Sequence, residues 1–201
     1  MTRTTLYLSC ITLLLACSQE MEQTEAPPAL PEDAPIAHTS DEHYSYAQGI
    51  VRYGGEAYSG YVLDLHPDGS PKKKTSIIEG KRNGPEWVWY PNGQLKEQRF
   101  YLDHQKHGEH KGWWPDGTPR FRYQFDRGQY DGEVINWFAN GKPLSVFHYE
   151  QGQEVGSQRL YREDGSFKAN YVVRDGRRYG LIGTKGCATL WKKDSLPQKR
   201  N

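Results

Sequence analysis

The sequence has few cysteines and no hydrophobic run long enough to cross a membrane. Of its 201 residues only three are Cys, and 35% are hydrophobic. The longest mostly apolar run, Leu6–Ala16, is shorter than the roughly 20 residues that a transmembrane helix needs. The chain also lacks a sustained helical stripe and helix-capping patterns. These absences exclude a multi-span membrane protein, a small disulfide-rich domain and a helical bundle.

Charge is distributed unevenly, although the formal net charge is only +1. Between Ser18 and Tyr44 there are seven Asp or Glu and no Lys or Arg. The residues after Tyr44 contain 25 basic and 18 acidic side chains, a net charge of +7. An acidic arm beside a basic body favours either an anionic partner or association of the arm with the body. Charge alone does not choose between the two.

The N-terminus has the pattern of a bacterial export signal. Arg3 precedes the apolar run, which ends in the residues LLAC at positions 14–17. These residues resemble the lipobox of bacterial lipoproteins, which implies that residues 1–16 are removed and that Cys17 is lipidated. Because Ser18 rather than Asp follows, the pattern implies the outer membrane in a Gram-negative cell. An ordinary secretory signal with a chance cysteine is the alternative.

Composition divides the remaining chain into three parts. Residues 17–45 contain four prolines among acidic and small side chains, so we expect a disordered tether. A strand docked on the first repeat is an open alternative for residues 44–53 only. Residues 46–182 are expected to form repeats. Residues 183–201 are expected to form a C-terminal cap and a basic tail that shield the last strand edge.

A pattern of 24 residues recurs through the repeat region. Two columns of glycines keep this spacing without a slip: Gly60, Gly84, Gly108, Gly132, Gly156 and Gly180, and then Gly69, Gly93, Gly117, Gly141 and Gly165. A third column contains Gly80, Gly128, Gly152 and Gly176, with His104 in the vacant position. Large side chains precede the second column by four residues: Leu65, Trp89, Trp113, Trp137 and Tyr161. Such strict repetition predicts a repeat protein.

The glycines of the second column end turns that read PDGS, PNGQ, PDGT, ANGK and EDGS. Pro sets the first corner of such a turn, Asp or Asn tolerates the second, and Gly accepts the positive φ that follows. We predict a three-residue loop with a bulge at the glycine, so that Trp89 faces Leu95 and Trp87 faces Glu97. A two-residue loop would pair Trp89 with Lys96 and scatter the apolar side chains between the faces.

The predicted fold class is therefore all-β, an elongated antiparallel sheet of tandem 24-residue β-hairpins. We expect strands at positions such as Phe121–Phe125 and Val134–Phe138, joined by a Gly-x-x-x-Gly turn. One face would collect large apolar side chains: Trp89, Trp113, Trp137, Leu95, Tyr101, Tyr123, Phe125, Phe147, Tyr149 and Tyr171. The other would carry basic and aromatic side chains: Lys72, Lys74, Lys96, Arg120, Arg122, Lys168, Tyr90, Trp114 and Phe138.

Two segments resemble a known repeat. Residues 84–93 (GPEWVWYPNG) and 132–141 (GEVINWFANG) are similar to MORN repeats, in particular to the bacterial variant of the YwqK-type family, which is often labelled as antitoxins. The resemblance implies a sheet of hairpins that serves as a binding, membrane-associating or scaffolding module. The lipoprotein-like leader departs from the pattern of a cytosolic antitoxin.

Few residues suggest chemistry. His104, His107 and His110 fall within one hairpin loop and are weak candidates for a metal site, although a solvated loop is the competing interpretation. Residues 180–186 are glycine-rich but lack the spacing of a phosphate-binding loop. Cys187 has no histidine near it in sequence, so it is either a small buried hydrophobe or half of an intermolecular bridge. We expect no enzyme and no cofactor.

The sequence thus predicts a lipid-anchored, non-catalytic binding or scaffold module of the bacterial cell envelope that engages a protein or envelope partner. The candidate contact residues are Tyr90, Trp114, Arg120, Arg122 and Phe138, and local packing within the sheet is the alternative role for each. Nucleic acid is not expected as a partner, because an exported chain does not meet it. The alternative function is an antitoxin or immunity-type protein that neutralises a specific toxin.

Overall fold

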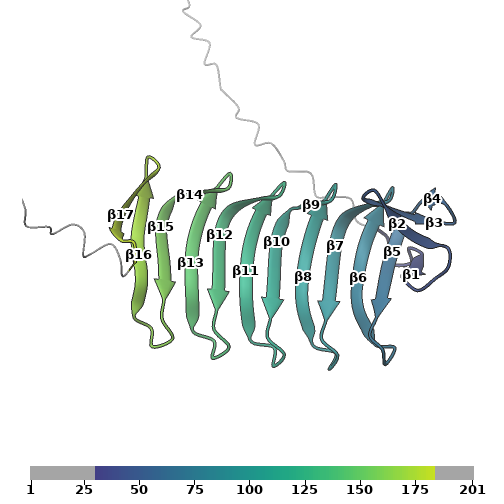
Figure 1. Cartoon of the computed structure of the whole chain (residues 1–201), viewed down its shortest axis with the longest axis horizontal. Helices are drawn as coiled ribbons and strands as arrows, with labels where there is room; N and C mark the ends of the chain where they lie inside the picture. Colours follow the sequence, from purple (N-terminus) through teal and green to yellow (C-terminus); the bar gives the residue numbers. More distant parts are fainter. Residues whose placement is uncertain (1–29, 184–201) are drawn as a thin grey trace, which may run out of the picture.

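The computed structural model describes residues 30–183, which form two mostly antiparallel sheets and no helix (Figure 1). The all-β prediction is confirmed. Because these residues contain no helix, none of them forms an apolar helix that could span a membrane. Residues 1–29 and 184–201, which include Cys17 and Cys187, lie outside the described residues.

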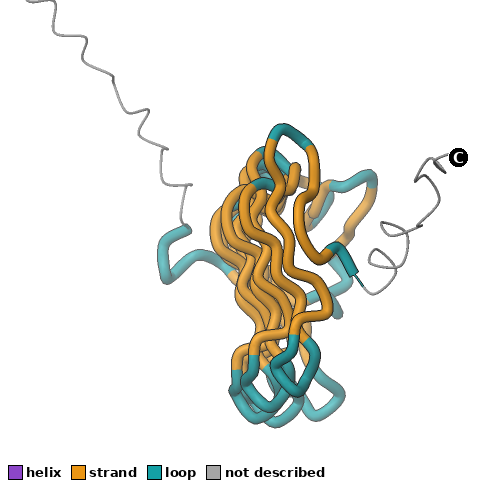
Figure 2. The backbone as a smooth tube through the Cα atoms, turned by 90° about the vertical axis from the view of Figure 1, so that its left-hand side faces the viewer, coloured by secondary structure: helices purple, strands orange, loops and turns teal. Residues whose placement is uncertain are grey.

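The larger sheet has 14 strands, and it is antiparallel except for the first pair at its N-terminal end. Ten of its strands build five consecutive hairpins: β5 (Gly60–Leu65) with β6 (Pro71–Ile78), β7 (Lys81–Trp89) with β8 (Leu95–Leu102), β10 (Gly108–Trp113) with β11 (Pro119–Asp126), β12 (Gln129–Trp137) with β13 (Pro143–Glu150), and β15 (Gly156–Tyr161) with β16 (Phe167–Arg174). The remaining strands are β1 (Ile36–His38), β9 (Gln105–Lys106), β14 (Gln153–Glu154) and β17 (Arg177–Leu181). Seen along the sheet, the hairpins lie one behind another with their loops in line (Figure 2).

The three-residue loop is confirmed in each of the five hairpins. In the second hairpin the N–H of Tyr90 donates to the carbonyl of Gln94 at 2.9 Å, and the N–H of Gly93 donates back to Tyr90 at 2.9 Å. Gly93 has a φ of 80°, which suits glycine far better than other residues. Trp89 consequently pairs with Leu95, as predicted.

The second loop position explains why either Asp or Asn can precede each loop glycine. Its side-chain oxygen accepts the N–H of the residue two positions later, as Asn92 does from Gln94 at 3.1 Å and Asp116 from Thr118 at 2.9 Å. An amide oxygen serves as well as a carboxylate here. In the Asp loops, hydrogen bonds from the residue two positions later hold the pKa of Asp116 below its usual value.

The prediction of which side chains share a face was wrong. A register shift lies between Val88 and Trp89, so that Val88 pairs with Glu97 and Trp87 pairs with Gln98. Lys96 is therefore an extra residue, and the same shift occurs in all five hairpins. Since one extra residue reverses the alternation of the strand, every residue after it moves to the other face.

The sheet accordingly has two faces of different composition. The tryptophan face contains Trp87, Trp89, Lys111, Trp113, Arg122, Ile135, Trp137 and His148. The tyrosine face contains Thr75, Glu86, Glu97, Tyr101, His110, Phe121, Tyr123, Phe125, Val134, Phe147, Tyr149 and Tyr171. Trp89, Trp113 and Trp137 lie on one face as expected, but the tyrosines and phenylalanines predicted to join them lie on the opposite one.

The predicted Gly-x-x-x-Gly turn was also wrong. The strands are joined by two-residue turns such as Arg127–Gly128, where both residues have positive φ, 41° and 88°. Gly132 instead lies within β12 beside a register shift. The turn N–H of Gly128 donates to the carbonyl of Lys106 in the preceding repeat at 2.7 Å. His104 fills the glycine position of such a turn with a φ of 66° and keeps the equivalent bond, to Arg82 at 2.8 Å.

Residues 30–45 correct the tether prediction, which covered residues 17–45. Strand β1 pairs in parallel with β5, and Ala37 is buried against Val62 and Ile77. Strands β2 (Tyr44–Ala47), β3 (Ile50–Tyr53) and β4 (Glu56–Ala57) form a separate three-stranded sheet, which lies at the N-terminal end of the long sheet (Figure 1). These residues cover the end of the sheet, so the regular hairpins begin at Gly60 rather than near residue 46.

A single close contact tests the face assignment. Gly112 lies beneath the ring of Phe121, and a Cβ atom at Gly112 would approach Cε1 of that ring to 2.2 Å. We predict that Gly112→Ala lowers the free energy of unfolding by about 1–3 kcal/mol, because the buried ring has to move. Urea denaturation followed by tryptophan fluorescence measures this. Adding Phe121→Leu should recover part of the loss, and a Gly112→Ala protein as stable as the wild type would contradict the packing.

Candidate functional site

The aromatic residues predicted to contact a partner stand directly before the three-residue loops. Tyr90, Trp114 and Phe138 are spaced by 24 residues and share one position with His66 and Arg162. The hydroxyl of Tyr90 donates to the carbonyl of Trp113 at 3.0 Å, and Nε2 of His66 lies 3.2 Å from the carbonyl of Trp89. At these two positions the side chain therefore links one hairpin to the next.

The two arginines predicted to join them lie on opposite faces. Arg120 is the extra residue of the third hairpin, and its guanidinium contacts Glu97 at 2.6 Å on the tyrosine face. It also stacks over Trp114 with its Cζ atom 5.7 Å from the ring centroid. Arg122 is on the tryptophan face, 2.6 Å from Glu133. The structure thus brings Tyr90, Trp114 and Arg120 together and separates Arg122 from them.

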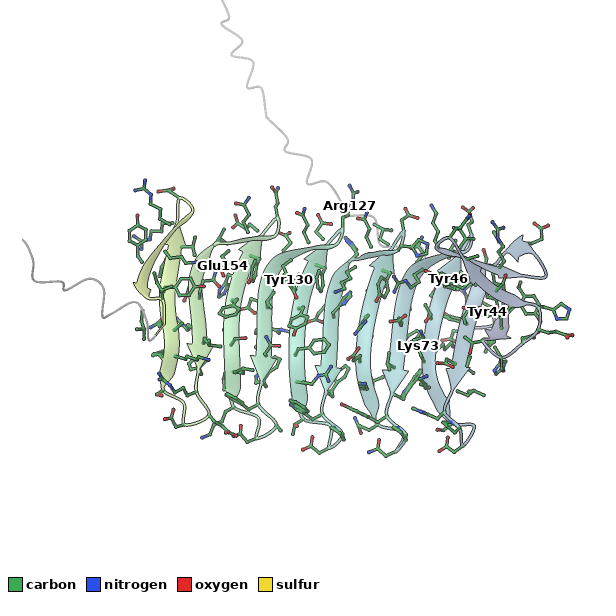
Figure 3. The ribbon with its side chains drawn as sticks, viewed as in Figure 1. Tyr44, Tyr46, Lys73, Arg127, Tyr130 and Glu154 are labelled. Atoms are coloured by element: carbon green, nitrogen blue, oxygen red, sulfur yellow. The ribbon has the colours of Figure 1, made fainter. Side chains whose placement is uncertain are left out.

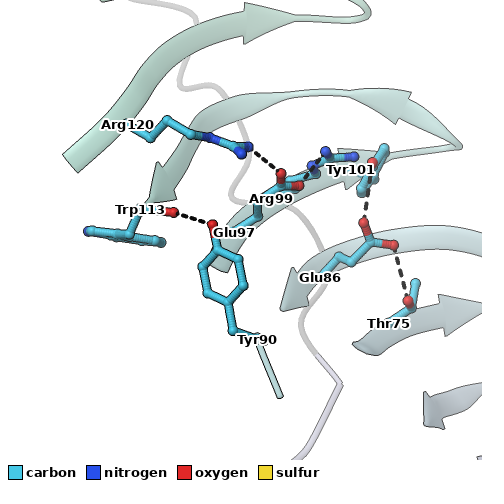
Figure 4. Close-up of polar contacts among 8 residues, drawn as sticks. All are labelled: Thr75, Glu86, Tyr90, Glu97, Arg99, Tyr101, Trp113 and Arg120. Carbon is cyan, nitrogen blue, oxygen red and sulfur yellow. Dashed lines mark hydrogen bonds and ion pairs between the residues drawn. The ribbon is translucent and has the colours of Figure 1, made fainter. Parts of the chain in front are cut away.

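Two buried carboxylates on the tyrosine face were missed by the sequence analysis (Figure 4). Glu97 is 7% exposed and binds the guanidinium groups of both Arg99 and Arg120. Glu86 is 4% exposed, accepts a 3.1 Å hydrogen bond from the Thr75 hydroxyl and lies 3.5 Å from that of Tyr101. Simple alternation placed Glu97 opposite Trp87, and only recognition of the extra residue at Lys96 would have placed it inside.

Aromatic rings form a nearly continuous ribbon across the tyrosine face. Ring centroids are 5.8 Å apart between Tyr101 and His110, 4.7 Å between His110 and Phe125, and 4.6 Å between Phe125 and Tyr130. The ribbon continues from Tyr130 to Tyr149 at 5.3 Å. These separations are those of favourable aromatic pairs, so the ribbon joins three hairpins through side chains as well as through backbone bonds.

Basic side chains lie over this ribbon at intervals of one repeat. Arg82 stacks over Tyr101 with 4.4 Å between its Cζ atom and the ring centroid, and Nζ of Lys106 lies 4.9 Å from the ring of Phe125. Tyr130 and Glu154 hold the next two equivalent positions (Figure 3). Glu154 accepts hydrogen bonds from the Tyr171 hydroxyl at 3.1 Å and from Arg178 at 3.0 Å. The face therefore presents both signs of charge beside aromatic rings.

A pocket of about 280 Å³ lies where the three-stranded sheet meets the tyrosine face. Its apolar wall consists of Val51, Val62 and Ile77, and its polar lining consists of Thr39, Tyr44, Tyr46, Lys73, Thr75, Arg82 and Glu86. Tyr44, Tyr46 and Lys73 lie close together at this end of the sheet (Figure 3). Two cationic side chains, a buried carboxylate and two tyrosines converge here, which is the composition of a binding pocket.

The three histidines of the predicted metal site have different partners. Nδ1 of His104 accepts the N–H of Arg82 at 3.2 Å, and Nδ1 of His107 lies 3.2 Å from Asp126. His110 is buried on the tyrosine face, where Nε2 lies 2.7 Å from the carbonyl of Phe100. Within residues 30–183 no three potential metal-ligating side chains gather at one point.

The repeated hairpin with its paired faces agrees with one family. The MORN repeat variant matches residues 82–103 and 130–151. The matched windows are β7 with β8 and β12 with β13, and the two MORN windows start 48 residues apart, which is twice the repeat length. The other three hairpins have the same loop and the same register shift. A comparison with curated proteins finds no match.

The match indicates a general role for these repeats. MORN repeats are generally non-catalytic, and they indicate a repeat-based binding or scaffold module. The YwqK-type relationship is not part of this match and stays a prediction.

The Glu97 cluster generates one prediction. Glu97→Gln removes the charge that two guanidinium groups share in a buried position, so we expect unfolding to become easier by roughly 2–3 kcal/mol. The control is Glu133→Gln, because Glu133 makes an ion pair with Arg122 on the exposed face and should contribute less than about 1 kcal/mol. Chemical denaturation of both variants measures the difference. Equal losses would show that the Glu97 cluster is not effectively buried.

His110 generates a prediction of pH dependence. Burial lowers its pKa from 6.5 to about 4. The unfolded chain therefore binds a proton at His110 between these two values while the folded chain does not, so stability falls as the pH drops from 6.5 towards 4. The shift corresponds to about 3 kcal/mol over that range. His110→Gln should flatten this part of the stability–pH curve, and a curve unchanged by this substitution would contradict the burial of His110.

Proposed function

We propose that the protein is a lipid-anchored binding module of the bacterial envelope that holds an extended segment of a partner protein along its tyrosine face. The pocket beneath the three-stranded sheet is the anchoring point. The observation that carries the proposal is that Lys73, Arg82 and Glu86 line this pocket together with two tyrosines.

The lining suits a protein side chain better than a large cofactor. A volume of about 280 Å³ accommodates one large side chain. The apolar wall would cover its stem, while Lys73, Arg82 and Glu86 would meet its polar end. Tyrosine and arginine are also the residues enriched at the energetic centres of protein interfaces. Beyond the pocket, the aromatic ribbon offers further positions for the same segment, beside basic side chains at Arg82 and Lys106 and an acidic one at Glu154.

The exposed positions near the pocket indicate where the partner would enter. Tyr46 lines the pocket and is 61% exposed. Lys73 also lines it, and no ion pair of the described residues involves Lys73. Tyr90, Trp114 and Phe138 lie along the loop side of the same face, and their role in partner contact stays a prediction. Arg120 makes an ion pair with the buried Glu97, so we assign it a role in stabilising the fold rather than in partner contact.

Photo-crosslinking from position 46 tests the protein partner. A photoreactive phenylalanine replaces Tyr46 in the full chain, expressed in its own bacterium, and envelope adducts are identified by mass spectrometry. We expect one dominant protein adduct that Lys73→Glu reduces at least tenfold, because the reversed charge disturbs the pocket. The matched control, Lys168→Glu, makes the same change at an exposed residue of the far hairpin. A yield unaffected by Lys73→Glu would count against the pocket.

The anchor is tested separately. Cys17→Ala should move the protein from the membrane fraction to the soluble envelope fraction, because the lipid attachment site is lost. Intact mass measurement of the wild-type chain should show loss of residues 1–16 and a diacyl or triacyl mass at Cys17. An unmodified cysteine would leave the binding module without an anchor.

The same adduct decides between the proposed module and the antitoxin or immunity alternative. If the captured partner is a toxin, expression of this chain should protect cells from that toxin, and Lys73→Glu should abolish the protection. A partner that has no toxic activity favours the scaffold.

A further inference from the structure

The tryptophan face presents a ladder of aromatic platforms. The ladder consists of the large side chains four residues before each loop glycine, one in each repeat: Leu65, Trp89, Trp113, Trp137 and Tyr161. The three indoles and the phenol are partly exposed rather than buried. Each is paired across its hairpin with a small or apolar residue, as Trp113 is with Pro119 and Trp137 with Pro143. The strand order of residues 30–183 places no second sheet over this ladder.

The face is hollowed between these platforms. A cleft of about 210 Å³ is lined by Trp113, Trp137, Pro119, Lys111 and Arg122, together with Gly112 and Phe121. A second hollow of about 300 Å³ is lined by Gln98, Phe100, Gly108, Glu109 and Lys111. Lys111 lines both hollows, so they adjoin, and their lining residues come from four neighbouring strands, β8, β10, β11 and β12.

The charged groups beside the cleft balance one another. Arg122 lies 2.6 Å from Glu133 and 4.0 Å from Glu109, which also binds Lys111. Nε2 of His148 is 3.5 Å from Glu133. The two acids and two bases are each 40–46% exposed. A network of zero net charge has no preference for a polyanion, but its donors and acceptors alternate, as the hydroxyl groups of a neutral ligand require.

The spacing of the ladder restricts the ligand further. Equivalent residues of neighbouring hairpins are two strands apart, which is about 9.6 Å. Side chains on one side of an extended peptide recur about every 6.7 Å. This spacing differs from that of the platforms, so successive side chains of a peptide would not fall on successive platforms. A disaccharide unit of an extended β-1,4-linked glycan has nearly the spacing of the ladder, and the apolar face of a sugar ring packs well on an indole.

We propose that the tryptophan face binds a neutral, linear β-linked glycan, with one disaccharide for each repeat. Alternate sugar rings lie on Trp89, Trp113, Trp137 and Tyr161, and the network around Arg122 and Glu133 holds their hydroxyl groups. The proposal goes beyond the protein-binding function, since it uses the opposite face and depends on neither the anchor nor the pocket.

Calorimetry on the purified residues 18–201 tests the ladder with β-1,4-linked oligomers of N-acetylglucosamine and of glucose, containing two, four or six sugars. We expect at least one series to bind with an affinity that rises at least tenfold from the dimer to the hexamer. Titration should also change the fluorescence of the wild-type tryptophans. Absence of binding by both hexamers at millimolar concentration, or affinity independent of length, would overturn the proposal.

Two substitutions separate this face from the pocket. Trp113→Ala, checked by circular dichroism for an unchanged fold, should weaken hexamer binding at least tenfold, whereas Tyr46→Ala on the other face should leave it unchanged. If Trp113→Ala fails to fold, the fluorescence change and the length dependence of the wild type decide the matter. A six-residue polygalacturonate that binds more tightly than both neutral hexamers would also overturn the proposal, because the network would then select for charge.

Discussion

In each hairpin the second strand contains one residue more than its partner directly after the loop, and this bulge governs the rest of the molecule. The extra residue follows the pair formed by the large side chain before the loop, as Lys96 follows the pair of Trp89 and Leu95. Backbone pairing resumes one residue later, with side chains exchanged between faces. Without the extra residue, Tyr101 and Phe125 would share a face with the tryptophans. The buried carboxylates, the aromatic ribbon and the exposed indole ladder all result from this one insertion.

The hairpins are tied to each other at both ends of their strands. At one end the N–H of a turn residue bonds to the preceding repeat, as Gly128 does to Lys106. At the other end Tyr90 reaches the backbone at Trp113. Each hairpin thus contacts only its neighbours, so stability is close to a sum of repeat and neighbour terms. The N-terminal residues provide the end cap, because β1 and the three-stranded sheet cover Ile77 and Val62.

The repeat length, the strand content and the three-residue loop could be predicted, because each depends on a local pattern: glycine at positive φ after Asp or Asn, and large side chains four residues earlier. The faces could not, since a bulge at Lys96 or Arg120 has no residue type of its own; Leu144 holds the same position in the fourth hairpin. The pocket was missed for another reason. It depends on strands at residues 36–57, which are short and rich in turn residues, and on their packing against side chains of β6 and β7.

The candidate contact residues also divide into those that a local pattern reveals and those that depend on packing between distant segments. Tyr90, Trp114 and Phe138 were found because they recur at one position, and recurrence marks a repeat's internal links as readily as its binding surface. Lys73 and Glu86 gain their significance only from the three-stranded sheet above them, which has no counterpart in the later hairpins. A repeat protein thus acquires a unique site where its regularity ends.

The turn-to-turn bond between residues 22 apart has an evolutionary consequence. Gly80, His104, Gly128 and Gly152 each donate to a carbonyl 22 positions earlier, at Tyr58, Arg82, Lys106 and Tyr130. Loss or duplication of any 24 consecutive residues between 60 and 180 restores every such bond with a new partner of the same kind. Unequal recombination can therefore lengthen or shorten the molecule in whole steps while both surfaces survive, whereas an insertion of any other size leaves a turn without its acceptor.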